Sequence, residues 1–112
     1  MKTSELTGAA LDWAVAKAEG NVQLQYDSRE GLIIRNILGW IPYRPSVAWQ
    51  QGGPIIERER IGLGHAISEG NSYWFAIGYL VEECGPTPLV AAMRCYVASK
   101  LSDEVEVPEE LQ

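Results

Sequence analysis

The residues that could carry acid–base chemistry lie close together near the middle of the chain. His65 is the only histidine, and Glu57 and Glu59 precede it in the same segment. Histidine is the usual general base near neutral pH, and a neighbouring carboxylate can orient its ring. A small enzyme that holds His65 with Glu57 or Glu59 in a cleft is therefore one hypothesis for the function.

Other signatures of catalysis and cofactor binding do not occur in the sequence. No serine stands in the G-x-S-x-G context of a hydrolase nucleophile. The fragment Gly62-Leu63-Gly64 lacks the later glycine of a dinucleotide-binding loop. Cys84 and Cys95 form no C-x-x-C pair, and with a single histidine they are too few to hold a structural zinc. The sequence therefore predicts no cofactor, no metal site and no catalytic residue.

Charge is unevenly distributed along the 112 residues. Residues 1–100 hold ten acidic and nine basic side chains, whereas residues 101–112 hold five acidic side chains and no basic one. The net charge of −6 therefore lies mainly in the tail, and no basic patch predicts direct binding to nucleic acid. A solvated, frayed tail is the simplest interpretation. An acidic decoy for a basic host protein, formed by residues 102–110, is an alternative.

Length and composition predict one globular domain. Hydrophobic residues make up 46% of the chain and include four tryptophans, which is enough for a core without metals or disulfides. No apolar run reaches the roughly 18 residues that a transmembrane helix needs, so no membrane association is expected. The first residues lack the apolar stretch of a signal peptide. We predict a single α+β domain over residues 1–101, an acidic C-terminal tail over residues 102–112 and a cytoplasmic location.

Two helices are predicted at the two ends of this domain. The first follows Thr7 and ends at Gly20, because glycine accepts the left-handed conformation that closes a helix. The second covers residues 88–101, where Thr87 is a good N-cap and Pro88 suits the first helical position. Its apolar stripe should cover one face of the core. The stripe consists of Leu89, Ala92, Met93, Tyr96 and Val97.

Between the helices the sequence predicts an antiparallel sheet of three to five strands. Residues 22–26 alternate between apolar and polar, and residues 32–37 return as the second strand of a hairpin. Residues 73–80 are nearly all apolar or aromatic and form the strongest strand, and residues 82–86 lead into the last helix. We expect both helices to cover the same sheet face, with the C-terminal helix packed on it. The uncovered face or an edge strand would then support a homodimer.

The stretch from residue 38 to residue 67 is the most distinctive part of the chain. Glycines and prolines recur over residues 38–54, which predicts an ordered loop whose aromatic side chains are too costly to leave in water. Residues 55–67 then read as an interrupted strand, with the acidic and basic side chains of residues 57–60 on opposite sides. A short helix over residues 55–60 is the alternative.

A candidate binding surface lies within this stretch. Trp49 stands near two consecutive glycines, where the backbone can turn sharply or be approached closely. Tryptophan, tyrosine and arginine dominate the hot spots of protein interfaces. We therefore predict that this region binds a protein. Its candidate residues are Trp49, Gly52, Gly53, Pro54, Glu57 and Arg58.

Two motifs give the chain a family resemblance. The motif W-x-x-G-G-P-I-I-E covers residues 49–57 and T-P-L-V-A-A-M covers residues 87–93, with an aromatic strand containing Trp74 and Ala76 between them. Together they resemble the NinX-like family of small phage and prophage proteins. The resemblance implies an accessory protein that acts inside the infected or lysogenic bacterium, and it implies no catalytic residue. The favoured hypothesis is thus a non-catalytic module that binds an unidentified host or phage protein.

Overall fold

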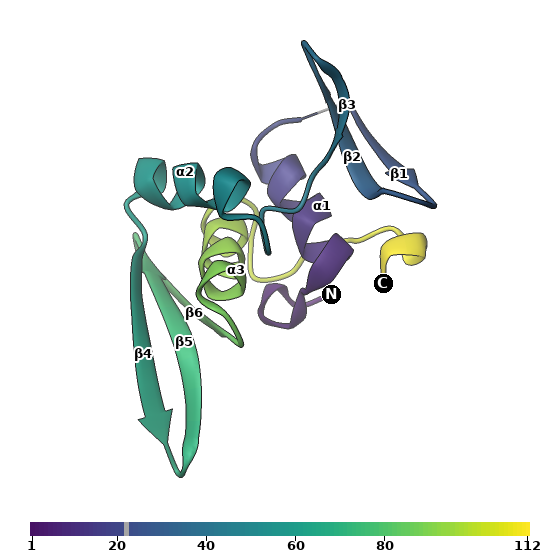
Figure 1. Ribbon diagram of the computed structural model, residues 1–112. Coiled ribbons are helices and arrows are strands. Elements are labelled where there is room, and N and C mark those ends of the chain that lie inside the picture. The colour runs from purple at the N-terminus through teal and green to yellow at the C-terminus, as the bar shows by residue number, and fades with distance from the viewer. Residues whose placement is uncertain (22) are drawn as a thin grey trace.

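The computed structural model describes residues 1–21 and 23–112, which form helices and two sheets (Figure 1). The elements of this part of the chain are η1 Thr3–Glu5, α1 Gly8–Ala18, β1 Leu24–Asp27, β2 Gly31–Asn36, β3 Gly39–Pro42, α2 Trp49–Glu59, β4 Gly62–Ser68, β5 Asn71–Gly78, β6 Val81–Gly85, α3 Pro88–Lys100 and η2 Glu109–Leu111. No described helix has the length and apolar character needed to cross a bilayer. Val22, the first residue of the predicted hairpin, lies outside the described residues, and β1 and β2 form the hairpin over residues 24–36.

The strands form two separate antiparallel sheets, β1-β2-β3 and β4-β5-β6, on opposite sides of the helices (Figure 1). Helix α3 packs on β5 and β6, whereas α1 packs on α3 and on β2. The α+β class and the C-terminal helix on a sheet are therefore confirmed. The expectation that both helices cover one sheet face is wrong. Helix α1 carries small apolar side chains on several of its faces, so it is buried between α3 and the first sheet instead.

Helix α3 is the centre of the core; it begins at its predicted first residue, Pro88, and ends at Lys100, one residue before its predicted end. The Thr87 hydroxyl accepts a hydrogen bond from the Val90 N–H at 3.1 Å, which confirms the N-cap. Met93 and Val97 are completely buried. Burial of such a side chain contributes about 1.5–3 kcal/mol to stability. This helix therefore carries a large share of the apolar packing that positions everything else.

The expected loop over residues 38–54 is wrong, since it contains β3 and the first half of α2. The expected strand over residues 55–67 is also wrong as far as Glu59, and the alternative of a helix there is closer. Gly52, Gly53 and Pro54 disfavour a helix locally. Packing overrides this preference, because the buried side of α2 contacts α3.

The segment expected to lead into the last helix is instead a strand, β6, which pairs with β5. Cys84 lies opposite Phe75 in that pairing and is exposed, whereas Cys95 is buried in α3. Two adjacent acids, Glu82 and Glu83, hide the strand in the sequence, because such residues are depleted in strands.

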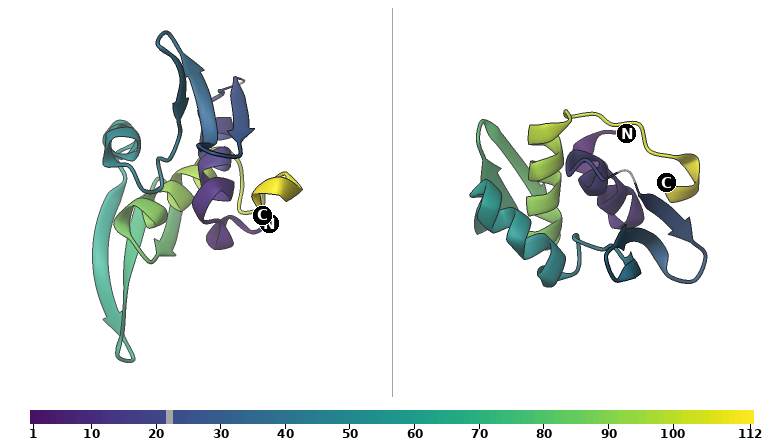
Figure 2. Two further views of the ribbon diagram at one scale, coloured as in Figure 1. Left: turned by 45° about the vertical axis from the view of Figure 1, so that its right-hand side comes forward. Right: turned by 90° about the horizontal axis from the view of Figure 1, so that it is seen from above.

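The acidic tail runs along the N-terminus and is not frayed, contrary to the simplest interpretation of the sequence. The amino group of Met1 donates to the Val105 carbonyl at 2.7 Å, and the buried Thr3 hydroxyl donates to the Ser102 carbonyl at 2.7 Å. Val107 is buried and belongs to the core. Figure 2 shows the two ends of the chain close together. These contacts attach the tail to the folded body.

Candidate functional site

Trp49 begins α2 and is 54% exposed, and its neighbour Val47 is 67% exposed. A hollow of about 190 Å³ lies beside them. It is lined by Ser46, Val47, Trp49, Thr87, Pro88 and Leu89, which we call the Trp49 surface. Exposed apolar side chains around a hollow are typical of interaction sites. The predicted binding residue Trp49 is thus accessible, and the start of α3 forms the opposite wall.

The two predicted glycines occupy very different surroundings. A Cβ atom on Gly52 would lie 2.4 Å from the carbonyl oxygen of Pro45 and 2.6 Å from Cδ2 of Leu89. Gly52 is therefore a packing residue that lets α2 approach α3 closely, and a partner cannot reach it. A Cβ atom on Gly53 would lie 3.9 Å from Cε3 of Trp49, which is an ordinary contact.

Pro54 and Glu57 are exposed on α2. Trp49, Gly53 and Glu57 are four residues apart in turn, so they follow one face of the helix. Glu57 therefore extends the accessible strip that begins at Trp49 and adds a negative charge to its far end. The strip consists of helical residues, and the alternation of charges expected for an extended strand does not occur.

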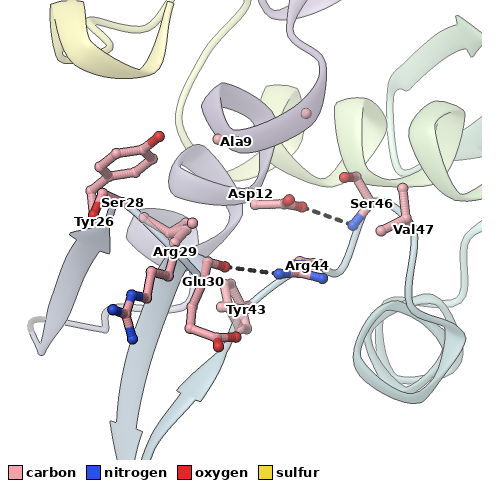
Figure 3. Close-up of a pocket in the computed structure, with 13 residues that line it drawn as sticks. Ala9, Asp12, Tyr26, Ser28, Arg29, Glu30, Tyr43, Arg44, Ser46 and Val47 are labelled. Atoms are coloured by element: carbon pink, nitrogen blue, oxygen red, sulfur yellow. Dashed lines mark hydrogen bonds between the residues drawn. The ribbon is translucent and has the colours of Figure 1, made fainter.

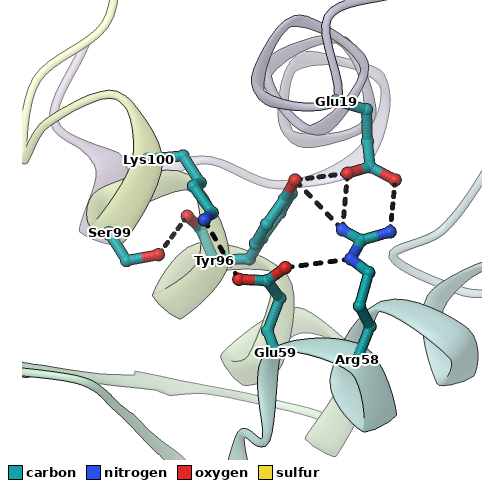
Figure 4. Close-up of polar contacts among 6 residues, drawn as sticks. All are labelled: Glu19, Arg58, Glu59, Tyr96, Ser99 and Lys100. Atoms are coloured by element: carbon teal, nitrogen blue, oxygen red, sulfur yellow. Dashed lines mark hydrogen bonds and ion pairs between the residues drawn. The ribbon is translucent and has the colours of Figure 1, made fainter.

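Arg58 joins three helices (Figure 4). Its guanidinium donates to both carboxylate oxygens of Glu19, at 2.6 and 3.2 Å, and to the Tyr96 hydroxyl at 3.2 Å. It also donates to Glu59 at 2.9 Å, and Lys100 lies 3.2 Å from the other oxygen of that carboxylate. These hydrogen bonds, led by the one to Glu19, raise the pKa of Arg58, and Arg58 lowers the pKa of Glu59. Arg58 is thus engaged within the protein, although half of its side chain is exposed.

The structure does not assemble the acid–base pair that the sequence suggested. His65 lies in β4, and its ring packs at a tilt on Trp74 with 4.9 Å between the ring centroids. Glu57 and Glu59 belong to α2, and Arg60, at a left-handed φ of 55°, separates that helix from β4. Across residues 1–21 and 23–112, His65 makes no hydrogen bond to either carboxylate.

The structure contains a second site, which the sequence did not predict. A cavity of about 400 Å³ lies between α1, the β1–β2 turn and the segment after β3 (Figure 3). Asp12 lines it and is only 4% exposed, and one of its oxygens accepts a hydrogen bond from the Ser46 N–H at 2.8 Å. Burial raises the pKa of Asp12 to about 6, although the hydrogen bonding of Ser46 and the positive charge of Arg44 act in the opposite direction.

The signal for this site was present in the sequence but weak. Asp12 precedes Val15 and Ala16 by three and four residues, so it lies on a buried face of its helix. An acid on such a face needs a partner, and Ser46 is distant in the sequence. A second carboxylate, that of Glu30, also lines the cavity, but no hydrogen bond joins the two acids among the described residues. The hydroxyl of Ser46 is buried and makes no hydrogen bond to any described residue.

The Asp12–Ser46 hydrogen bond fixes the segment that carries the Trp49 surface. Ser46 lines both the cavity and the hollow beside Trp49, and Val47 follows it directly. The Arg44 guanidinium donates to the Glu30 carbonyl at 2.8 Å, which attaches the same segment to the first sheet. The two sites are therefore mechanically connected through residues 44–47.

Comparison with known proteins identifies a family for the chain. No curated protein matches it. The family model described as Bacteriophage P22, NinX matches residues 2–100, from the N-terminal turn to the end of α3. The match includes the Trp49 surface, the Asp12 cavity and the Arg58 contacts. The chain therefore belongs to the P22 NinX family of bacteriophage proteins.

Proposed function

We propose that this phage protein is a non-catalytic module that binds a host or phage protein through the Trp49 surface, in the cytoplasm of the infected or lysogenic bacterium. The observation that carries the proposal is the half-exposed indole of Trp49 beside the exposed Val47 and a hollow. Tryptophan is enriched in interface hot spots because one side chain buries a large apolar area at low entropic cost.

The shape of the surface favours a partner with one protruding apolar side chain. Pro88 and Leu89 form one wall of the hollow and Trp49 forms another, so an inserted aliphatic or aromatic group would contact apolar atoms on both sides. Glu57 at the end of the strip would contribute mainly to partner selection, because rim charges affect encounter more than affinity.

The surface is also held in place before a partner arrives. Gly52 packs tightly on Pro45 and Leu89, and the Ser46 N–H is bonded to Asp12. A binding surface that is already ordered loses little conformational entropy on association. This rigidity supports recognition by a preformed site.

Trp49→Ala is expected to abolish capture of the partner. The wild-type protein, Trp49→Ala and Trp40→Ala would each be used to capture proteins from a lysate of infected host cells, with identification by mass spectrometry. Trp40 is the matched control, because it is 40% exposed but lies on β3, outside the Trp49 surface. A protein retained by the wild type and by Trp40→Ala, and lost with Trp49→Ala, would support the proposal.

The captured protein would then be purified and titrated against the wild type and the two variants. Loss of a hot-spot tryptophan costs about 2 kcal/mol or more, so the dissociation constant of Trp49→Ala should rise by roughly 30-fold. Equal affinities for the wild type and Trp49→Ala, with both proteins folded, would exclude the Trp49 surface as the binding site.

A further inference from the structure

The edge strand β4 is open along its whole length. The strand order β4-β5-β6 gives it one neighbour, and Figure 1 shows its other edge turned away from the helices. Its seven residues include no proline, aspartate, glutamate, lysine or arginine. Natural proteins usually protect an exposed edge with charge, proline, short length or a covering segment.

The other described edges carry such protection. Strand β6 contains Glu82 and Glu83 and lies against the N-terminal turn η1. Strands β1 and β3 have four residues each, and β3 ends in Pro42. Among the strands in residues 1–21 and 23–112, β4 is therefore a long edge strand that has none of these protective features.

The turn that follows β4 determines which backbone groups face outward. Glu69 and Gly70 have φ angles of 51° and 81°, as in a two-residue type I′ turn. In such a hairpin Ser68 and Asn71 bond to each other, and hydrogen-bonded pairs then alternate along the ladder. The N–H and C=O groups of the intervening residues consequently point away from β5. These residues are Leu63, His65 and Ile67.

We propose that β4 pairs with β4 of a second copy of this chain, antiparallel and about a two-fold axis at His65. In that register Leu63 of one copy faces Ile67 of the other, and Gly64 faces Ala66. The outward groups would form up to about six backbone hydrogen bonds and join the two sheets into one. This inference goes beyond the proposed function and does not depend on the Trp49 surface.

The side chains of β4 suit a second copy of the same strand. Leu63 is 38% exposed and Ile67 is 74% exposed, and in this register each covers the other. Leu63 and Ile67 are four residues apart in one strand, so both side chains lie on the same sheet face. Their β5 partners on that face are Ala76 and Ser72. The strand carries no lysine, arginine, aspartate or glutamate that a two-fold axis would bring together, and the axis places His65 opposite His65 of the second copy. A β6 pairing would place glutamates near one another.

A pair of double variants tests the register. Leu63→Lys with Ile67→Lys places like charges opposite each other twice across the axis. Leu63→Lys with Ile67→Glu changes the same two positions but places opposite charges there. The dimer dissociation constant would be measured by sedimentation equilibrium over the micromolar range for both variants and for the wild type. Circular dichroism and thermal unfolding would confirm that each variant is folded.

We expect the wild type to dimerise, the lysine–lysine variant to dimerise at least about ten-fold more weakly, and the lysine–glutamate variant to recover most of that loss. Trp49→Ala should dimerise like the wild type, so failure of the proposed function leaves this test unaffected. The proposal would be overturned by a monomeric wild type. It would also be overturned if the two folded double variants had equal dimer dissociation constants, which would mean that the glutamate recovers nothing.

Discussion

Asp12→Asn is expected to make the protein more stable at neutral pH and to remove part of its pH dependence. Burial raises the pKa of Asp12 from 3.8 to about 6, so the native state holds a proton that the unfolded chain releases. Stability from this proton is complete below about pH 4 and is lost as pH rises through about 6. Above about pH 6, a pKa shift of this size lowers the free energy of unfolding by about 3 kcal/mol relative to its value below pH 4.

Urea unfolding of the wild type and Asp12→Asn, compared at several pH values between about 4 and 7, would measure the effect. The difference between the two proteins cancels the titration of the other carboxyl groups. Asparagine keeps an oxygen that can accept from the Ser46 N–H, and Asp12→Ala does not, so the alanine variant should be less stable than the asparagine variant throughout. A difference between wild type and Asp12→Asn that stays constant with pH would contradict the argument.

Gly52→Ala is expected to destabilise the protein by about 1–3 kcal/mol, even though alanine favours a helix. The added methyl group would lie 2.4 Å from the backbone carbonyl oxygen of Pro45, which cannot move without shifting the segment that carries Val47. Gly53→Ala should instead stabilise α2 by about 0.5–1 kcal/mol, because the nearest atom of Trp49 is 3.9 Å away.

The two adjacent substitutions control for each other, since they change the same residue type in the same helix. Thermal and urea unfolding would give the free energy of unfolding for each. If both alanines stabilised the protein, the close approach of α2 to α3 would not be needed for stability. The glycine at position 52 of the motif would then need an explanation other than close helix packing.

Local sequence signals predicted α3 well and α2 poorly, for a physical reason. Thr87 and Pro88 mark the start of α3, and its apolar spacing agrees with a helix at every level. In α2 the local signals conflict, because Gly52 and Pro54 disfavour the helix that long-range packing requires. Strand patterns likewise identified β1, β2 and β5, but the residue pattern of one strand does not indicate which strands pair with it. The division into two sheets therefore could not be predicted.

The candidate site was likewise predictable only where a local signal marks a residue. Trp49 could be proposed as a candidate because a large aromatic residue near glycines is informative by itself, and the structure shows it to be accessible. Arg58 could not be placed, because its partners Glu19 and Tyr96 come from two other helices. The Asp12 cavity depends on a contact across 34 residues, which no local pattern contains.

The attachment of the tail to the N-terminus has a kinetic consequence. The hydrogen bond between Met1 and Val105 joins residues 104 positions apart, so it closes nearly the largest loop that this chain can form. Closing a large loop is entropically expensive until the intervening elements are already compact. We therefore expect docking of Val105 and Val107 to be a late event in folding, and local opening to begin there. The core around α3 can remain closed while the two ends separate.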